Sequence, residues 1–207
     1  MTSSIPFQTL NLTEAPPSST TTSFVLSPPV PSDIWRKPPS LDVFDAPIIY
    51  KSIPLSKFKR VRVTISAPWK TLYDQGGLVF VLPPSPSSSE KQRRWVKSGV
   101  EFVDGKPFVS TVAADRWADW SLVKLGDEQG EVTIEFERRE KDDTLWVYVI
   151  EGGERAPARE VTWALAEFGG EGEQQECWVG VYAAKPTADQ EEQLVVGFKD
   201  FEVEVLE

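Results

Sequence analysis

The chain contains no histidine, and Cys177 is the single cysteine among its 207 residues. The lack of histidine excludes an imidazole base, a histidine metal ligand and a Ser-His-Asp triad. One cysteine cannot form an intrachain disulfide, which fits a reducing compartment. Most hydrolase mechanisms are therefore unavailable, and any chemistry must rest on carboxylates, amines and aromatic rings.

Basic residues are in the minority. Lysine and arginine total 22 and aspartate and glutamate total 32, for a formal net charge of -10. This balance argues against a nucleic-acid partner, which normally requires a concentrated basic face. Residues 1–22 have no basic or apolar leader, Thr2 replaces the glycine that myristoylation requires, and the longest apolar run is Leu78 to Leu82. We expect a cytoplasmic protein with no membrane partner, and its oligomeric state is open.

Helical patterns are scarce, whereas alternation of apolar and polar residues recurs from Tyr50 onward. Frequent turn signals between short alternating segments are typical of a two-sheet sandwich or a barrel, so the fold class is all-β. Residues 1–22, rich in Ser, Thr and Pro, are expected to form a flexible tail, and residues 23–207 a single domain. The predicted strands are a short one near Phe24 to Ser27, then Ile48 to Lys51, Lys59 to Ala67, Gly77 to Leu82, Trp95 to Val103, Phe108 to Ala113, Asp119 to Leu125, Glu131 to Arg139, Leu145 to Ile150, Thr162 to Phe168, Cys177 to Ala183 and Leu194 to Leu206.

One hairpin can be predicted residue by residue. The dipeptide Asp104-Gly105 favours a type I′ turn, because both central residues of that turn take positive φ. A hairpin on this turn pairs Val103 with Lys106, and alternation then separates a core face from a face that is wet or lines a cleft. The core face holds Val96, Ser98, Val100 and Phe102, and the opposite face holds Trp95, Lys97, Gly99 and Glu101.

The same split occurs in two other segments. In LWVYVI, residues 145–150, Trp146 and Tyr148 project away from the core positions. In CWVGVYA, residues 177–183, Trp178 and Tyr182 project away from the side that holds Cys177. The thiol is therefore expected to be buried and inert.

Several blocks of the chain resemble the regulation-of-enolase-like family, a domain of unknown function in the concanavalin A-like lectin/glucanase superfamily. The blocks are SDIWRKPP (32–39), YDQGGLVF (73–80), WVKSGVEFVDGKPFVSTV (95–112), DWS (119–121), VGVYAAKP (179–186) and VGFKDFEVE (196–204). The resemblance covers about residues 24–207 and implies a jelly-roll sandwich of two antiparallel sheets, with a concave face that holds the ligand in sugar-binding relatives. It implies no catalytic motif. The chain departs from the family pattern at RWADWS (116–121) and in an insertion over Pro83 to Arg94.

Aromatic and charged residues on the predicted non-core faces form the candidate site. Flat rings stack on a sugar or an apolar ring system, and a few polar groups orient it. The alternative, purely structural interpretation is that the rings complete the core and the charged side chains are solvated. The candidate ligand-binding residues are Gln75, Trp95, Lys97, Glu101, Trp120, Trp146, Tyr148, Trp178 and Tyr182, of which Lys97 and Glu101 would be catalytic if the protein is an enzyme.

Glu135 and Glu137 have the alternate spacing of a glycosidase acid pair. Two residues along a strand span roughly 6.6 Å, close to the separation used for glycoside hydrolysis. Because Val132, Ile134 and Phe136 define the core face, however, the two carboxylates are expected on an ordinary outer face. No metal site is expected, since Asp142-Asp143 and the acidic run 171–176 lack a ligand rhythm, and no cofactor motif is present.

Two functions fit these residues. The first is a lectin-like domain that binds a small organic ligand or carbohydrate in a cleft, with a regulatory role in metabolism as one use of such binding. The alternative is a cofactor-free cyclase, isomerase or lyase, for example a pericyclase of fungal-type secondary metabolism, in which Lys97 and Glu101 act in an aromatic cleft. A scaffold that uses the sheet surface for protein contacts is a weaker third interpretation.

Overall fold

The computed structural model describes residues 5–82, 92–126, 131–139, 141–166, 175–188 and 193–206. This part of the chain forms strands, one 3-10 turn, η1 (Leu55–Lys57), and no α-helix. None of its helical segments is long and apolar enough to cross a membrane. The strands are β1 (Gln8–Leu10), β2 (Phe24–Leu26), β3 (Ile34–Lys37), β4 (Leu41–Phe44), β5 (Ile48–Pro54), β6 (Phe58–Ser66), β7 (Gln75–Leu82), β8 (Arg94–Val103), β9 (Lys106–Ala114), β10 (Ala118–Lys124), β11 (Val132–Arg139), β12 (Thr144–Glu151), β13 (Glu154–Val161), β14 (Glu176–Ala184) and β15 (Val196–Val205).

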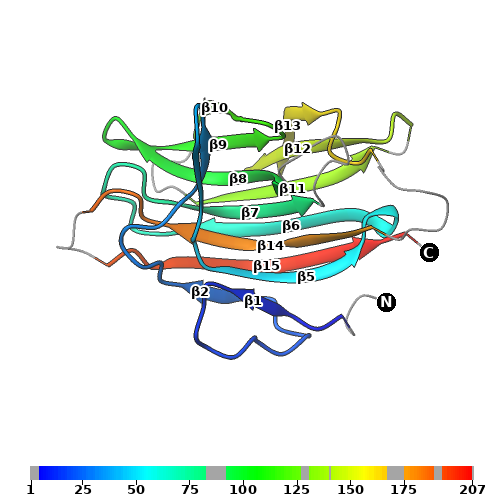
Figure 1. Ribbon diagram of the computed structural model, residues 1–207, viewed down its shortest axis with the longest axis horizontal. Coiled ribbons are helices and arrows are strands. Elements are labelled where there is room, and N and C mark those ends of the chain that lie inside the picture. Colours follow the sequence, from blue (N-terminus) through cyan, green and yellow to red (C-terminus); the bar gives the residue numbers. More distant parts are fainter. Residues whose placement is uncertain are drawn as a thin grey trace.

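The strands build two antiparallel sheets. The seven-stranded sheet has the order β1-β5-β14-β7-β8-β9-β10, and the six-stranded sheet has the order β13-β12-β11-β6-β15-β2. Each sheet combines hairpin neighbours, such as β7-β8-β9, with neighbours that are distant in the sequence, such as β5-β14 and β6-β15. Crossovers between the sheets produce the distant pairings. Figure 1 looks through both layers, whose strands run in nearly the same direction. The predicted all-β jelly-roll sandwich is confirmed.

The core lies between the two sheets and follows the period-2 alternation of the strands. On β6 the inward residues Val61, Val63 and Ile65 are fully buried, while the residues between them are half-exposed. Phe58 of the six-stranded sheet contacts Phe80 of the seven-stranded sheet, with ring centroids 4.7 Å apart. Burying an aliphatic or aromatic side chain of this size contributes about 1.5–3 kcal/mol, so these residues hold the layers together.

A second cluster covers the outer face of the seven-stranded sheet. Residues 31–47 contain β3 and β4 and run across the strands of this sheet, in dark blue in Figure 1. We call this segment the strap. Ile34 of the strap belongs to one buried cluster with Trp95 and Tyr182, and all three side chains are at most 1% exposed. Arg36 fastens the strap by donating to Asp42 and to the backbone carbonyl of Asp115. Both faces of this sheet are therefore packed, which explains why β7 is buried along its whole length.

The N-terminal segment differs from the expected flexible tail. Gln8–Leu10 pairs with β5, and Phe7 is only 4% exposed. The Phe7 ring packs edge-on against Phe24 at 5.1 Å and beside Phe201 at 5.7 Å. Residues 1–22 are polar on average, but the single aromatic residue Phe7 is enough to anchor the short strand β1. The short strand expected near Phe24 is confirmed as β2.

The predicted hairpin is confirmed, and one predicted strand is wrong. Val103 pairs with Lys106, and Asp104 and Gly105 take positive φ values of 51° and 77°. The strand predicted at Thr162 to Phe168 is displaced: β13 precedes it, and residues 162–165 form a turn. β13 is an edge strand, and its Pro157 lies beside a shift in the pairing register with β12. Proline has no N–H to donate and is tolerated at such a position. It also interrupts the alternation of apolar and polar residues from which strands were predicted.

Candidate functional site

A pocket of about 460 Å³ opens on the outer face of the seven-stranded sheet, beside the strap. Of the nine residues expected in the site, it brings together Gln75, Lys97, Glu101 and Trp120. The strap and the loops that precede β7 and follow β14 supply most of the other walls. The complete lining is Asp33, Trp35, Lys37, Tyr73, Gln75, Lys97, Glu101, Val112, Trp120, Pro186 and Thr187.

A hydrogen-bonded group forms the floor of the pocket. Lys97 Nζ donates to Gln75 Oε1 at 2.6 Å and lies 3.5 Å from Asp33 Oδ1 on the strap. Gln75 Nε2 donates to the same Asp33 oxygen at 3.2 Å, and the Tyr182 hydroxyl donates to Gln75 Oε1 at 3.3 Å. The lysine is 2% exposed, so its charge is held by these few acceptors and not by bulk water.

Two glycines allow β7 and β8, which carry this floor, to approach closely. Gly77 and Gly99 face each other on β7 and β8. A Cβ on Gly99 would lie 2.0 Å from the Gly76 carbonyl oxygen, and a Cβ on Gly77 would lie 2.6 Å from the Cα of Gly99. The close approach requires glycine at both positions. It also leaves no side chain between Lys97 and Glu101 on β8.

A second polar chain orients Glu101. The Trp120 indole nitrogen donates to Ser110 Oγ at 2.9 Å, and Ser110 Oγ donates to Glu101 Oε2 at 2.6 Å. Glu101 also lines the pocket, so its carboxylate is within reach of a ligand. Glu101 can therefore accept a hydrogen bond or a proton from a bound ligand.

Burial shifts the two charged groups of the floor in opposite directions. Desolvation raises the pKa of Glu101, although the charge of Lys97 and the hydrogen bond from Ser110 oppose the shift. Desolvation lowers the pKa of Lys97, against the charges of Asp33 and Glu101. Opposed pKa shifts in one cleft are typical of groups that exchange protons with a ligand.

Three aromatic rings form one wall. The ring of Trp120 meets Trp35 edge-on at 6.1 Å and Tyr73 at 6.4 Å, with interplanar angles of 81° and 69°. Trp120 comes from the RWADWS segment, while residues 83–91 of the predicted insertion lie outside the described residues. The sequence interpretation missed Trp35 and Tyr73, because β3 is too short for an alternation signal and Tyr73 lies in a turn. Both residues lie in blocks that carry the family resemblance, SDIWRKPP and YDQGGLVF, and this was the signal that could have identified them.

The mouth of the pocket is fixed by a buried ion pair. Lys185 Nζ lies 3.2 Å from Asp74 Oδ1, and Asp74 Oδ2 accepts from the backbone N–H of Thr71 at 2.9 Å. Next to them, Tyr73 holds a φ of 68°, which is rare for a bulky residue, and its N–H donates to the Phe102 carbonyl. The surrounding bonds thus hold a strained residue whose ring lines the site, a feature that recurs at functional sites.

The other expected site residues lie elsewhere. Trp95 and Tyr182 are on the predicted face but beneath the strap, at 0% and 1% exposure, so they support the floor. Trp178 stacks on Tyr50 at 4.5 Å, away from the pocket lining. Trp146 and Tyr148 are on the outer face of the six-stranded sheet, so their expected place beside Lys97 and Glu101 is wrong. Alternation assigns a residue to a face of its strand, but not to one of the two sheets.

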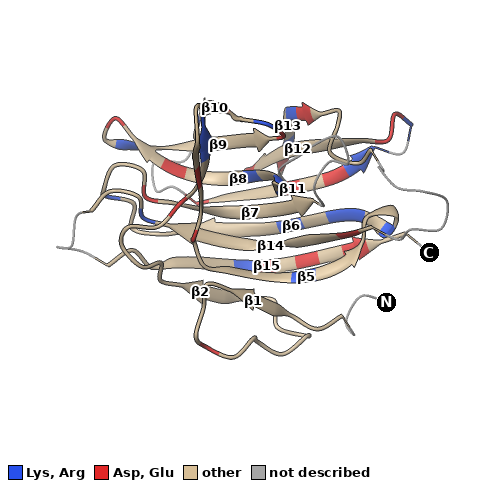
Figure 2. Ribbon diagram, viewed as in Figure 1, with Lys and Arg blue, Asp and Glu red and all other residues tan. Residues whose placement is uncertain are grey.

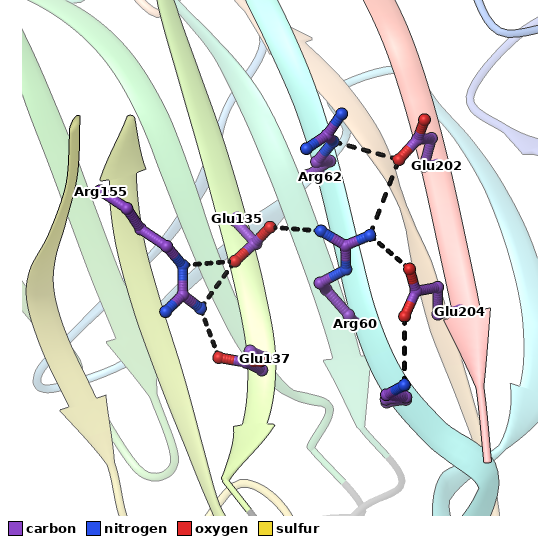
Figure 3. A network of polar contacts seen from close by, with 8 residues as sticks. Arg60, Arg62, Glu135, Glu137, Arg155, Glu202 and Glu204 are labelled. Atoms are coloured by element: carbon purple, nitrogen blue, oxygen red, sulfur yellow. Dashed lines mark hydrogen bonds and ion pairs between the residues drawn. The ribbon is translucent and has the colours of Figure 1, made fainter. Parts of the chain in front are cut away.

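The Glu135 and Glu137 pair is also on the six-stranded sheet, as part of an ion-pair network shown in Figure 3. Glu135 accepts from Arg60 at 2.9 Å and from Arg155 at 2.7 Å, and Glu137 accepts from Arg155. Figure 2 shows the alternating charges across β11, β6 and β15. The predicted outer face is confirmed, but Glu135 is 3% exposed and is held by arginines instead of water.

Two further expectations can be compared with the structure. Cys177 is fully buried in the core, and burial raises the pKa of its thiol far above the usual range, as expected for an inert cysteine. The acidic run at 171–176 falls largely outside the described residues. Among the residues that are described, no group of three or more acidic or cysteine side chains is arranged to hold a metal ion.

Comparison with known proteins places the chain in a family. Residues 13–205 match the family described as "Protein of unknown function (DUF1349)". An uncharacterized protein of Emericella nidulans is 46% identical over 201 residues, which cover 96% of each chain. The chain belongs to the DUF1349 family. The regulation-of-enolase-like name that the sequence blocks suggested stays a prediction.

Solved structures share the fold of this DUF1349 protein. A functionally unknown protein from Saccharomyces cerevisiae has a TM-score of 0.73 at 19% identity and covers 98% of this chain and 97% of its own. A mutant of the GH43 protein BlXynB from Bacillus licheniformis has a TM-score of 0.52 at 13% identity, over 77% of this chain and 29% of its own. At these identities the likeness concerns the sandwich alone.

Proposed function

We propose that this DUF1349 protein binds a small organic ligand or carbohydrate in the strap pocket. The observation that carries the proposal is the combination of an aromatic wall with a preformed polar floor in one cavity. A volume of about 460 Å³ lies in the range of small-molecule sites. The floor is fixed by the bonds among Lys97, Gln75 and Asp33, so little ordering is required when a ligand binds.

The chemistry of the lining favours a ligand with both ring surface and hydroxyl or carbonyl groups. Trp35, Trp120 and Tyr73 offer ring surface for stacking. Lys97 and Gln75 can donate to a ligand oxygen, and Glu101 can accept from a hydroxyl. A monosaccharide or a hydroxylated metabolite satisfies both requirements. If such a metabolite is bound without being changed, the protein would act as a metabolic sensor or regulator.

Thermal-shift screening followed by calorimetry tests the proposal. The probes are neutral hexoses and pentoses, sugar acids and hydroxylated aromatic compounds. A probe at about 100 times its Kd stabilises the native protein by ~2.7 kcal/mol. We expect Trp120→Ala to weaken binding at least tenfold, because it removes wall surface and the donor to Ser110. Trp146→Ala on the six-stranded sheet is the matched control and should leave affinity unchanged; the reverse pattern would contradict the proposed pocket.

A further inference from the structure

The pocket floor has the layout of a proton-transfer site. We propose that this protein catalyses proton transfer at the carbon next to the carbonyl group of a small α-hydroxy aldehyde or ketone, with Glu101 as the base and Lys97 as the group that stabilises the enolate oxygen. The inference rests on the proposed function, because it uses the same pocket and narrows its ligand to carbonyl compounds of three to six carbons.

The register of the strands brings the two groups within reach of one ligand. Four residues along a strand would separate Lys97 and Glu101 by roughly 13 Å between Cα atoms. The lysine side chain, however, reaches Gln75 Oε1, and Gln75 stands directly opposite Glu101 on the neighbouring strand. Cβ atoms of such cross-strand pairs are about 4.5–5.5 Å apart. The ammonium group therefore lies near the carboxylate and not at the far end of the face.

The space between the two groups is open to a ligand. Gly99, the residue between them on this face of β8, has no side chain that could extend over the pocket. In the part of the chain that the structure describes, Lys97 and Glu101 form no ion pair with each other, since the close acceptors of the lysine are Gln75 and Asp33. Both groups line the pocket. A ligand carbonyl can thus bind Lys97 while the adjacent carbon faces Glu101.

The environments of the two groups suit these separate roles. Two oxygen acceptors hold Lys97 Nζ as a donor, which is the form that stabilises a developing oxyanion. Glu101 accepts from the neutral Ser110 hydroxyl and forms no ion pair among the described residues, so its carboxylate can act as a base toward a ligand in the pocket. Burial raises the pKa of Glu101, which makes it a stronger base than an exposed carboxylate.

The proposed step is balanced without an oxidant, a metal or a cofactor. The Glu101 carboxylate removes a proton from the carbon next to the carbonyl group. The electrons of that C–H bond form a C=C bond, and the carbonyl π electrons move to the oxygen, where Lys97 donates a hydrogen bond. Protonated Glu101 then returns the proton. Return to the same carbon gives the starting compound. If the proton of the neighbouring hydroxyl group first moves to the enolate oxygen, return to the former carbonyl carbon gives the aldose or ketose isomer.

Hydrogen–deuterium exchange measures this step without knowledge of the physiological product. The protein is incubated in D₂O with dihydroxyacetone, D-glyceraldehyde, D-xylulose or D-fructose, and loss of the proton signal next to the carbonyl group is followed by NMR. We expect exchange above the buffer rate for at least one probe. Because a positioned general base contributes about 10²–10⁴-fold, Glu101→Gln should lower the rate by at least 100-fold. Lys97→Met should lower it as well, because it removes the donor to the enolate oxygen.

Glu137→Gln is the matched control, since it removes a carboxylate from the other sheet and should keep the wild-type exchange rate. Thermal unfolding of each variant shows whether it is folded, and Glu101→Asp provides a second test if Glu101→Gln unfolds. Exchange that persists in folded Glu101→Gln, or no exchange with any of the four probes, overturns the proposal. A probe that stabilises the protein without exchanging overturns the activity and leaves ligand binding intact. If neither these four probes nor any compound of the thermal-shift panel binds, both proposals are contradicted.

Discussion

Asp74 and Lys185 form an ion pair that is almost wholly excluded from solvent, with exposed fractions of 2% and 1%. The pair joins the loop before β7 to the segment after β14, and both lead to walls of the pocket. Thr187 adds a bond from its hydroxyl to the Leu72 carbonyl across the same gap. The shape of the pocket mouth therefore depends on an ion pair between two segments that are far apart in the sequence.

Removal of one member of this pair should be strongly destabilising. Lys185→Met leaves the Asp74 carboxylate buried without its cation, which costs about 3–5 kcal/mol of unfolding free energy. Urea denaturation measures the loss. The control is Lys199→Met. Lys199 forms an exposed ion pair with Glu131, with 3.9 Å between nitrogen and oxygen, so its removal should change the unfolding free energy by less than ~1 kcal/mol. Equal effects of the two substitutions would show that the buried pair does not form.

The pKa of Glu101 predicts a specific dependence of stability on pH. Because folding raises this pKa, the folded state favours the protonated acid. The contribution of Glu101 to stability is thus largest below the pKa of the unfolded chain, and it falls as the pH rises through the window up to the folded pKa. Glu101→Gln removes this dependence, so we expect its stability relative to the wild type to increase between pH 4 and pH 8.

Glu204 supplies the opposite sign in the same experiment. The hydrogen bond from Arg60 lowers the pKa of Glu204, so the ionised group stabilises the fold above the unfolded pKa and loses that effect as the pH falls through the folded pKa. Glu204→Gln should therefore destabilise the protein more at pH 7 than at pH 4. Urea denaturation of both variants across this range checks the two signs, and parallel curves would contradict the assigned environments.

The facing glycines predict a sharp difference between two similar substitutions. Gly99→Ala would place a Cβ 2.0 Å from a backbone oxygen, and the strands must move apart to accept it. Overpacking of this kind costs typically about 1–3 kcal/mol, and moving the two strands apart also shifts Lys97 and Glu101 on β8 relative to Gln75 on β7. Gly197→Ala meets its nearest atom at 3.5 Å, an ordinary contact, and should be tolerated. Thermal unfolding and ligand titration of the two variants test the expectation; equal stability would contradict the close approach of the strands.

The sequence predicted the parts of this site that depend on alternation within one strand. The face shared by Lys97, Gly99 and Glu101 followed from the Asp104-Gly105 turn, and the structure confirms its register. The contribution of the strap could not be predicted, because Asp33 and Trp35 reach the pocket through a long crossover that leaves no periodic signal. Trp146 was misplaced for a related reason: period-2 patterns do not distinguish the outer faces of two sheets.

The ion-pair network on the six-stranded sheet should matter for stability and not for the pocket. Glu135 accepts hydrogen bonds from two arginines while it is nearly inaccessible to water, so Glu135→Gln weakens two charge-assisted bonds. Hydrogen bonds to charged groups contribute about 1.5–3 kcal/mol each, and the neutral amide of glutamine keeps part of that contribution. We therefore expect urea denaturation of Glu135→Gln to show an unfolding free energy about 1–3 kcal/mol lower than that of the wild type. Because the network and the pocket lie on opposite sides of the sandwich, ligand affinity and proton exchange should not change. A loss of either at constant stability would instead make Glu135 part of the reacting site, as the glycosidase spacing of Glu135 and Glu137 first suggested.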